Sequence, residues 1–296
     1  MNHSDINTHC GFVTIMGRPS VGKSSLLNRI IGYKTAIVSA LPQTTQKSIR
    51  GIYTDYRGQI IFLDTPGLHQ SEQRFNQALN MQTINAVQES DLILYISDAS
   101  RQPGVEEQDA AKIALESGRK IIIALNKMDQ ERVFLSEYQL FFHNYWPDIS
   151  YFPISVVTGE GIERLKKEIF LSLPPGPLFY PKDVYTDQEP SFRIAEIIRE
   201  QAIIRVRQEV PHSLYVEIAD LEKHGETLWI RAFLIVERRT QKGMLIGKEG
   251  QIIRAIRLAS VKGLKKFFFS KIDLDLQVKV DHEWRKNAHR IKTLFG

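Results

Sequence analysis

The feature that most constrains the fold of this chain is the stretch GRPSVGKS at residues 17–24. An apolar run at residues 12–16 precedes it and a helical pattern at residues 23–31 follows it, so the local order is strand, loop, helix. Gly17 and Gly22 permit backbone angles that turn several N–H groups towards one concave surface, and the helix adds the positive end of its dipole. This combination is typical of a P-loop, which binds the phosphates of a nucleotide.

Two polar side chains of this loop have specific expected roles. Lys23 can reach the outer phosphates as a point charge, which makes it a candidate catalytic residue, and the Ser24 hydroxyl can bind Mg²⁺. A chance glycine-rich turn is the alternative, but the strand and the helix on either side argue against it. The nucleotide-binding residues expected here are Gly17, Arg18, Pro19, Ser20, Val21, Gly22, Lys23, Ser24 and Ser25.

Apolar runs and helical patterns alternate through residue 172. The expected strands cover residues 12–16, 49–53, 60–63, 92–97, 120–125 and 151–154, and the expected helices cover residues 23–31, 76–89, 106–116, 132–144 and 162–171. Such alternation predicts an α/β fold in which a largely parallel sheet carries helices on both faces. Ligands of such sheets bind at the carboxyl ends of the strands, which is where the next motifs lie.

A DTPG stretch at residues 64–67 directly follows the apolar run 60–63. Asp64 can hold Mg²⁺ through a water molecule, and the Gly67 N–H can donate to a γ-phosphate. Many surface turns carry D-x-x-G, so the weight of this motif comes from the strand before it and the P-loop upstream. The nucleotide contacts expected here come from Asp64, Thr65, Pro66, Gly67 and Leu68.

An NKMD stretch at residues 126–129 follows the apolar run 120–125. A carboxylate at Asp129 can accept hydrogen bonds from guanine N1–H and N2–H₂, a donor pair that adenine lacks, and would therefore select GTP over ATP. Asn126 would tie this loop to the P-loop, and a backbone amide after residue 154 can contact guanine O6; a polar turn is the alternative. The expected contacts are Asn126, Lys127, Met128, Asp129, Ser155, Val156 and Val157.

A polar stretch, LPQTTQK at residues 41–47, lies between the first helix and the next strand. A threonine here can close over Mg²⁺ and the γ-phosphate and let go after hydrolysis. Thr44 and Thr45 compete for this role, and we favour Thr45. An ordinary polar loop is the alternative. The expected catalytic residues are then Lys23, Thr45 and Gly67, and the expected metal ligands are Ser24, Thr45 and Asp64.

These five stretches, in this order, resemble the G1 to G5 boxes of translation-factor-class GTPases over residues 10–172. The resemblance implies hydrolysis of GTP to GDP with Mg²⁺ as the metal. Leu68 stands where Ras-like proteins have a glutamine that orients water, which implies slow hydrolysis or groups supplied by a partner or a cation. Relatives often have asparagine, a K⁺ ligand, where Ser20 stands, so K⁺ activation stays open. Val156 replaces the usual alanine.

Composition limits the location and the partners. No apolar run approaches the roughly 20 residues that span a bilayer, and the polar residues 1–9 are expected to be a flexible tail rather than a signal peptide. The single cysteine excludes an internal disulfide and fits a reducing cytoplasm. The net charge of +5 is uneven, because residues 231–271 hold 11 basic and 2 acidic side chains, which is typical of a surface that meets a polyanion.

A proline-rich stretch at residues 173–181 marks a change of domain, because it cannot continue a helix or a sheet. We interpret residues 173–190 as a stiff, extended linker between a domain at 10–172 and a smaller one at 191–296. For the second domain the pattern predicts a helix at 192–206 and strands at 214–218, 228–236 and 272–280. Core positions are expected for Phe267, Phe268 and Phe269, and packing or surface positions for His282, Trp284 and His289.

The basic stretch contains GKEG at residues 247–250, which fits the loop that holds a nucleic-acid backbone in KH domains. Two glycines let the sugar–phosphate chain approach closely, and apolar neighbours would form a floor for bases. A bare G-x-x-G is common, and a solvated helix face is the alternative for the lysines and arginines nearby. The expected RNA-binding residues are Ile246, Gly247, Lys248, Glu249, Gly250, Ile253, Arg254 and Arg257.

A P-loop GTPase followed by a KH domain resembles the Era family of bacterial ribosome-assembly GTPases, within the TrmE-Era-EngA-like group. Matching stretches are DTPGLH at 64–69, AEIIRE at 195–200 and EVPHS at 209–213. The resemblance implies a type II α+β KH domain. It also implies that the chain binds the small ribosomal subunit and its 16S ribosomal RNA near the 3′ end, and that it associates peripherally with the inner face of the cell membrane. We expect a monomer.

Two other functions stay open at this point. One is an RNA-binding module in which the nucleotide is a structural ligand that is not turned over. The other is a membrane-surface regulatory GTPase whose basic half binds anionic lipid rather than RNA. GTP turnover tests the first, and competition between RNA and lipid vesicles tests the second.

Overall fold

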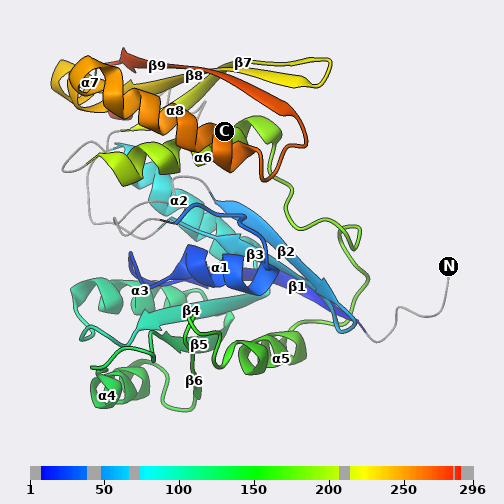
Figure 1. The fold of residues 1–296 in the computed structure, drawn as a ribbon. Coiled ribbons are helices and arrows are strands. Elements are labelled where there is room, and N and C mark those ends of the chain that lie inside the picture. Colours follow the sequence, from blue (N-terminus) through cyan, green and yellow to red (C-terminus); the bar gives the residue numbers. More distant parts are fainter. Residues whose placement is uncertain (1–7, 39–47, 67–73, 207–213, 283, 288–296) are drawn as a thin grey trace. The chain divides into compact units, whose positions relative to one another are not determined.

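The computed structural model describes residues 8–38, 48–66, 74–206, 214–282 and 284–287 (Figure 1). The chain divides into two compact units, the first drawn from within residues 1–187 and the second made mainly of residues 188–296. The predicted linker at 173–190 therefore belongs mostly to the first unit.

The first unit is built on a six-stranded sheet with the order β2-β3-β1-β4-β5-β6. Its strands are β1 (His9–Met16), β2 (Ile49–Asp55), β3 (Gly58–Asp64), β4 (Leu92–Asp98), β5 (Lys120–Asn126) and β6 (Tyr151–Pro153). Neighbouring strands are parallel except β2 and β3, which follow each other in the chain and pair antiparallel. The predicted α/β fold is confirmed.

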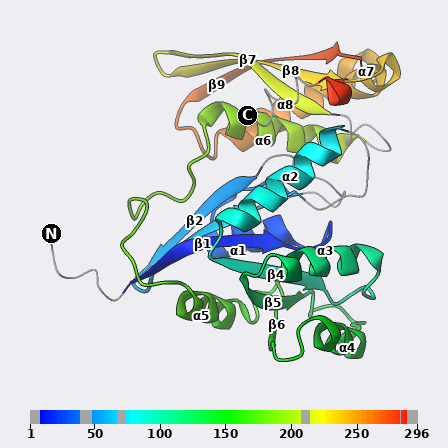
Figure 2. The ribbon, with the colours of Figure 1, turned by 180° about the vertical axis from the view of Figure 1, so that it is seen from behind.

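Helices cover both faces of this sheet. They are α1 (Lys23–Ile31), α2 (Arg74–Glu89), α3 (Val105–Glu116), α4 (Leu135–Tyr145) and α5 (Ile162–Ser172). The chain moves from β1 to β3 in one direction and from β3 to β4 in the other, so right-handed crossovers place α1 and α2 on opposite faces. Helices α2, α3 and α4 share one apolar core with the strands, and Figure 2 shows the face that carries α2 and α3.

The carboxyl ends of the central strands meet at one edge of the sheet. Ile15 of β1 pairs with Asp64 of β3, and Asp98 of β4 pairs with Asn126 of β5. Strands β3 and β4 are buried at every position, as expected for central strands of a parallel sheet, so their last residues are held firmly. The three motifs that follow β1, β3 and β5 therefore start close together.

The proline-rich segment after α5 is held against the first unit instead of extending freely. Gln59 of β3 is fully buried, and its Oε1 accepts hydrogen bonds from the backbone N–H groups of Phe179 and Tyr180, each over 2.9 Å. Further along, the Ile52 N–H of β2 donates to the Tyr185 carbonyl over 2.9 Å. These bonds join residues that lie far apart in the sequence, so the prolines alone did not reveal them.

Strand β1 begins at His9, which lies inside the predicted tail of residues 1–9. The His9 N–H donates to the Arg57 carbonyl over 2.9 Å, and the Cys10 N–H donates to the Pro174 carbonyl over 3.0 Å. Cys10 is buried in this strand, and burial raises the pKa of its thiol. Its position is that of a small core residue.

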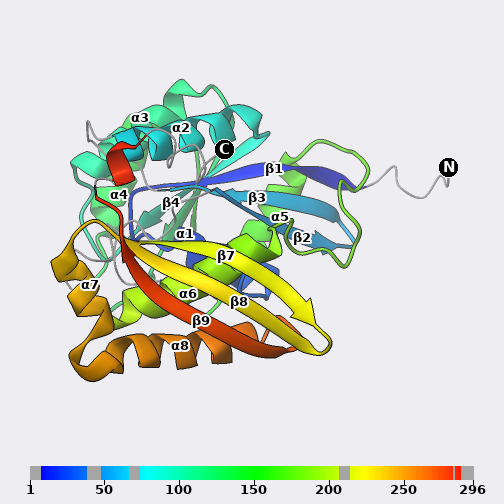
Figure 3. The same ribbon diagram turned by 90° about the horizontal axis from the view of Figure 1, so that it is seen from above.

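The second unit contains a three-stranded sheet, seen with its strands side by side in Figure 3. Its elements are α6 (Pro190–Arg205), β7 (Tyr215–His224), β8 (Thr227–Val236), α7 (Arg239–Ile246), the 3₁₀ turn η2 (Lys248–Gly250), α8 (Gln251–Leu264), β9 (Lys271–Val280) and the 3₁₀ turn η3 (Trp284–Lys286). Strands β7 and β8 are antiparallel, and β8 and β9 are parallel. Helices α7 and α8 make the crossover that a parallel pair requires.

The core of the second unit confirms most of the predicted packing positions. Phe267 and Phe268 pack against the apolar core, whereas Phe269 is fully exposed, which corrects the prediction for that residue. Consecutive side chains after a helix end point in different directions, so three in a row cannot all face one core. Trp284 is buried, with its ring centroid 4.6 Å from that of Tyr215. His282 is exposed, and His289 lies outside the described residues.

Candidate nucleotide and nucleic-acid sites

The glycines of the P-loop are required by close contacts. Gly17 has φ 153°, and a Cβ there would lie 2.2 Å from the carbonyl oxygen of Ile96. Gly22 has φ 106°, and a Cβ there would lie 2.6 Å from Nδ2 of Asn126. Any side chain at either position would displace backbone or the Asn126 amide. The loop therefore holds the shape that the sequence predicted, and its exposed Ser20 takes φ 64°.

Lys23 lies beneath the loop, at the start of α1. Its Nζ donates to the carbonyl oxygens of Gly17, over 2.9 Å, and Arg18, over 3.0 Å. Burial lowers the pKa of Lys23 to about 8, although the carboxylates of Asp64 and Glu107 act in the opposite direction. A phosphate oxygen next to this ammonium would stabilise its charged form. The position suits a lysine that neutralises the outer phosphates of a nucleotide.

Ser24 and Asp64 form the pair predicted for the metal. Ser24 Oγ donates to Asp64 Oδ2 over 2.6 Å, and Asp64 is fully buried at the end of β3. Mg²⁺ prefers oxygen ligands and is usually held by one or two carboxylates together with substrate phosphates, so this hydroxyl and carboxylate fit the ion. When bound, Mg²⁺ supplies positive charge to the phosphates. Thr45, the third predicted ligand, and its competitor Thr44 lie outside the described residues.

Two hydrogen bonds hold the described part of the DTPG segment, residues 64–66. Thr65 Oγ1 donates to the Ile15 carbonyl of β1 over 3.1 Å, and Thr83 Oγ1 of α2 donates to the Pro66 carbonyl over 3.0 Å. These bonds fix Asp64 and the residues after it beside the P-loop. Gly67 and Leu68, for which γ-phosphate contact is predicted, lie outside the described residues.

Asn126 connects three segments predicted to bind the nucleotide; its bond to the P-loop was expected, and its bond to Val156 was not. Its Nδ2 donates to the Val21 carbonyl of the P-loop over 2.8 Å, and its Oδ1 accepts from the Val156 N–H over 3.1 Å. The next residue, Lys127, takes φ 67°, and its Nζ lies 2.7 Å from Oδ2 of Asp98. The predicted phosphate and base segments are thereby brought to one end of the sheet.

Asp129 is exposed at the end of this loop, where a base can reach it. Its Oδ1 accepts a hydrogen bond from the buried Ser155 hydroxyl over 2.6 Å. This bond is the main reason why the pKa of Asp129 is lowered, so the carboxylate is ionised and acts only as an acceptor. Ser155 therefore orients the carboxylate that is predicted to select guanine. Val157 is exposed, and Met128 is half-buried with its N–H bonded to the Ile154 carbonyl.

The GKEG loop in the second unit joins α7 to α8. Gly247 has φ 72°, and a Cβ there would lie 2.6 Å from Cγ1 of Ile252. Gly250 has φ 73°, but a Cβ there would meet only Ile253, at 3.9 Å, so this position has open space around it. Lys248 and Glu249 are exposed. The loop can therefore receive a sugar–phosphate chain at Gly250.

Apolar and basic side chains flank this loop. Ile246, Ile252 and Ile253 are partly buried against the core, which leaves part of each for contact with bases. Arg254 is exposed. Arg257 instead donates from Nε to the Leu274 carbonyl, so its guanidinium is engaged by β9. An RNA contact from Arg257 stays a prediction and would have to coexist with that bond.

Comparison with known families identifies two domains in this chain. The family model described as "50S ribosome-binding GTPase" matches residues 12–127, and a KH domain model matches residues 209–285. A protein of Treponema denticola named GTPase Era is 45% identical over 96% of this chain and 98% of its own length. GTPase Era of Borreliella burgdorferi is 44% identical over 97% of this chain and 99% of its own length. The chain belongs to the Era family of GTPases.

Two solved Era structures are similar over their full length. One, from Aquifex aeolicus and bound to GDP and AlF₄⁻, has a TM-score of 0.92 and 30% identity, covering 98% of this chain and 99% of that one. The other, a complex with MgGDPNP and nucleotides 1506–1542 of 16S ribosomal RNA, has a TM-score of 0.93, 30% identity and the same coverage. The GTPase-plus-KH fold expected for this Era-family chain is confirmed.

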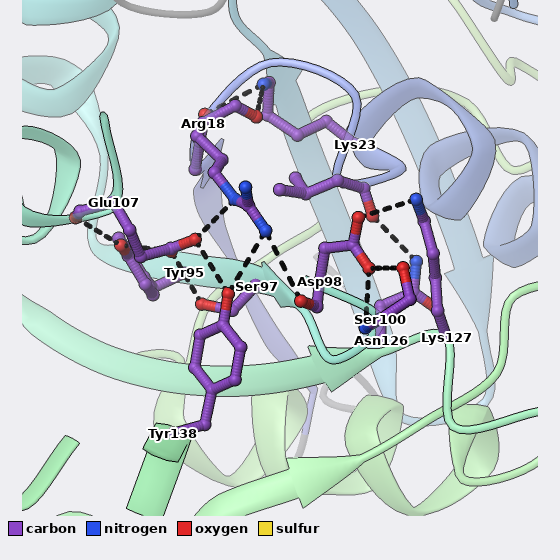
Figure 4. A network of polar contacts seen from close by, with 12 residues as sticks. Arg18, Lys23, Tyr95, Ser97, Asp98, Ser100, Glu107, Asn126, Lys127 and Tyr138 are labelled. Atoms are coloured by element: carbon purple, nitrogen blue, oxygen red, sulfur yellow. Dashed lines mark hydrogen bonds and ion pairs between the residues drawn. The ribbon is translucent and has the colours of Figure 1, made fainter. Parts of the chain in front are cut away.

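The motifs did not reveal a second layer of this Era-family site. Figure 4 shows Arg18 of the P-loop linked to Lys127 of the NKMD stretch through Asp98, and paired separately with Glu107. One signal in the sequence pointed to it. Glu107 lies on the same face of α3 as the buried Ala110, Ala111 and Ala114, and a carboxylate on such a face needs a buried partner.

Proposed function

We propose that this chain is a GTP-hydrolysing switch that binds 16S ribosomal RNA near its 3′ end in the assembly of the small ribosomal subunit. The proposal assigns GTP hydrolysis to residues 10–172 and RNA binding to residues 191–296, joined by the linker at 173–190. The observation that carries it is the presence in one chain of an Asp129 carboxylate oriented by Ser155 and an open GKEG loop. The Era complex with MgGDPNP and 16S ribosomal RNA supports the pairing of these ligands.

In this proposal the phosphates lie in the P-loop and Lys23 neutralises the outermost ones. Ser24 and Asp64 hold Mg²⁺, and Thr45 and Gly67 follow the γ-phosphate. Leu68 cannot orient water by hydrogen bonding, so intrinsic hydrolysis is slow. The proposal does not include K⁺ activation. Ser20 has a hydroxyl at the position where the proteins that this chain resembles have an asparagine amide oxygen as a K⁺ ligand.

The proposed switch couples the two ligands. GTP and Mg²⁺ order the segments around Thr45 and around Asp64–Leu68, and this ordering changes the access of the GKEG loop to RNA. Hydrolysis and phosphate release reverse the change. The γ-phosphate can shift this equilibrium only by the difference between its free energies of interaction with the two states.

Asp129→Asn is expected to reduce the affinity for GDP about a hundredfold and to leave the weak binding of ADP unchanged. The asparagine offers an amide N–H₂ or a neutral carbonyl to two guanine donors, so one donor loses its partner. Fluorescence titration with labelled GDP and ADP measures the effect. Glu131→Gln, the same loss of charge at an exposed position two residues away, is the matched control and should bind GDP like the parent chain.

Titration of a labelled RNA that carries a 3′-end segment of 16S ribosomal RNA tests the RNA half. The chain should bind this RNA at least tenfold more tightly than a scrambled strand of the same composition. Equal affinity for both strands would contradict sequence-specific recognition and leave only attraction between a basic surface and a polyanion.

We also propose peripheral association with the inner face of the cell membrane, and a monomeric state. The basic residues 231–271 support the first part, because anionic lipid attracts clustered lysines and arginines. Among the described residues, no helix has the length and apolar character needed to cross a bilayer. Flotation with anionic vesicles, against neutral ones as control, tests the association. Light scattering of the purified chain tests the monomer.

A further inference from the structure

A buried ion pair joins the P-loop to helix α3 (Figure 4). The Nε atom of Arg18 lies 2.7 Å from Oε2 of Glu107, and the two side chains are 4% and 0% exposed. Arg18 Nη2 also lies 3.3 Å from the Tyr138 hydroxyl and 3.4 Å from the Asp98 carbonyl. Arg18 and Lys23 are the two buried cationic side chains of the P-loop. Arg18 is therefore held by Glu107, an acid that lies outside the five motifs.

Three hydroxyl groups fix the Glu107 carboxylate. Oε1 accepts from Tyr95 over 2.6 Å and from Ser97 over 2.8 Å, and Oε2 accepts from Tyr138 over 3.1 Å. Burial and the charge of Glu107 raise the pKa values of both tyrosines, so their hydroxyls keep their protons and continue to donate. A carboxylate with this many donors is held in one orientation.

The fixed Glu107 carboxylate is connected through Arg18 to Lys23, the side chain proposed to contact phosphate. The carbonyl oxygen of Arg18 accepts from Lys23 Nζ over 3.0 Å, so the Arg18 residue connects Glu107 to the phosphate-binding lysine. On the other side, the Asp98 carbonyl lies near Arg18, while its carboxylate pairs with Lys127 over 2.7 Å. The network therefore runs beneath both the phosphate loop and the base loop.

We propose that Glu107 is a positioning residue of the nucleotide site. Its carboxylate fixes Arg18 and thereby the turn of the P-loop that presents Lys23 and the backbone N–H groups to the phosphates. The inference rests on the proposed binding of GTP and GDP and adds a residue that none of the five motifs contains. A purely structural ion pair, which stabilises the fold without affecting the ligand, is the competing explanation.

Glu107→Gln is expected to weaken the binding of both GDP and GTP about thirtyfold, mainly through faster dissociation. It leaves the buried Arg18 charge without a counter-charge, so Arg18 moves and the loop loses its set shape. Stopped-flow fluorescence with labelled nucleotide measures the dissociation rate, and circular dichroism shows whether the variant is folded. Glu106→Gln, the exposed neighbour on the same helical turn, is the matched control and should dissociate like the parent chain.

A double variant separates positioning from fold stability. Arg18→Met together with Glu107→Gln removes both charges, and the glutamine keeps an amide oxygen as an acceptor for the Tyr95 and Ser97 hydroxyls, so no buried charge is left without a partner. We expect the double variant to recover its melting temperature but to keep fast nucleotide dissociation, and Glu107→Asp, which keeps the charge, to bind more tightly than Glu107→Gln.

Two results would overturn the inference. One is a nucleotide dissociation rate of Glu107→Gln equal to that of the parent chain, and the other is a parental dissociation rate in the stable double variant. Either would make the ion pair a support of the fold only. Failure of the parent chain to bind GTP at all would instead contradict the proposed function, so the two failures are distinguishable.

Discussion

Replacing Lys23 with alanine is expected to lower the affinity for GTP about a thousandfold and to abolish measurable turnover. The buried ammonium, now bonded to the Gly17 and Arg18 carbonyls, would contribute charge-assisted bonds to phosphate oxygens worth about 1.5–3 kcal/mol each. Loss of two such bonds corresponds to about 4 kcal/mol, or roughly three orders of magnitude in the dissociation constant. Phosphate release under single-turnover conditions, with GTP above the weakened dissociation constant, measures turnover apart from binding.

The control for this variant is Lys112→Ala on α3. Lys112 is 71% exposed, and its Nζ lies 3.9 Å from Glu116 Oε1, so removing this surface charge should change neither GTP affinity nor turnover. Turnover by Lys23→Ala at the parental rate would place catalysis elsewhere in the chain. A parent chain that binds GTP tightly but never hydrolyses it would favour the structural-nucleotide alternative.

Gly250→Asp is expected to reduce RNA affinity at least tenfold while GTP turnover stays unchanged. Aspartate tolerates a positive φ better than most residues, and a Cβ at this position has open space, so the variant should fold. Its carboxylate, however, would lie where the loop must receive an RNA phosphate. The negative charges of the carboxylate and the phosphate would then repel each other at close range. Fluorescence anisotropy with the 16S ribosomal RNA segment provides the measurement.

Gly250→Asn separates charge from shape in the same loop. Asparagine has nearly the size of aspartate and also accepts a positive φ, so it should retain most of the RNA affinity. Anionic vesicles added as competitors address the membrane alternative. If the vesicles displaced RNA at low lipid concentration and Gly250→Asp bound RNA normally, the GKEG loop would not be the RNA site.

Much of this fold was predictable because its signals are local. Helix α1 begins and ends at the predicted residues, 23 and 31, since the P-loop precedes it and Gly32 ends it in a left-handed conformation. The strands were found as apolar runs because those of a parallel sheet are buried on both faces. The order of the strands then placed the ends of β1, β3 and β5 together, which is why the sequence also predicted the nucleotide site.

The features that escaped prediction depend on contacts between distant residues. Gln59 reads as a polar residue at a strand start, and only the fold shows that it binds the backbone of Phe179 and Tyr180. Glu107 reads as one of two acids at a helix start, and only its position opposite Arg18 distinguishes it from Glu106. Such pairings cannot be derived from periodicity, because the partners share no local pattern.

The central claim is that the bound nucleotide determines the affinity of the chain for RNA. Equilibrium binding measurements test this claim most directly. The affinity of the purified chain for the 16S ribosomal RNA segment would be measured without nucleotide, with GDP, and with Mg²⁺ and a non-hydrolysable GTP analogue. A coupling free energy in the usual range predicts a difference of about fivefold or more between the GDP and GTP-analogue states. Equal affinities in all three conditions would contradict the switch and leave two independent binding domains in one chain.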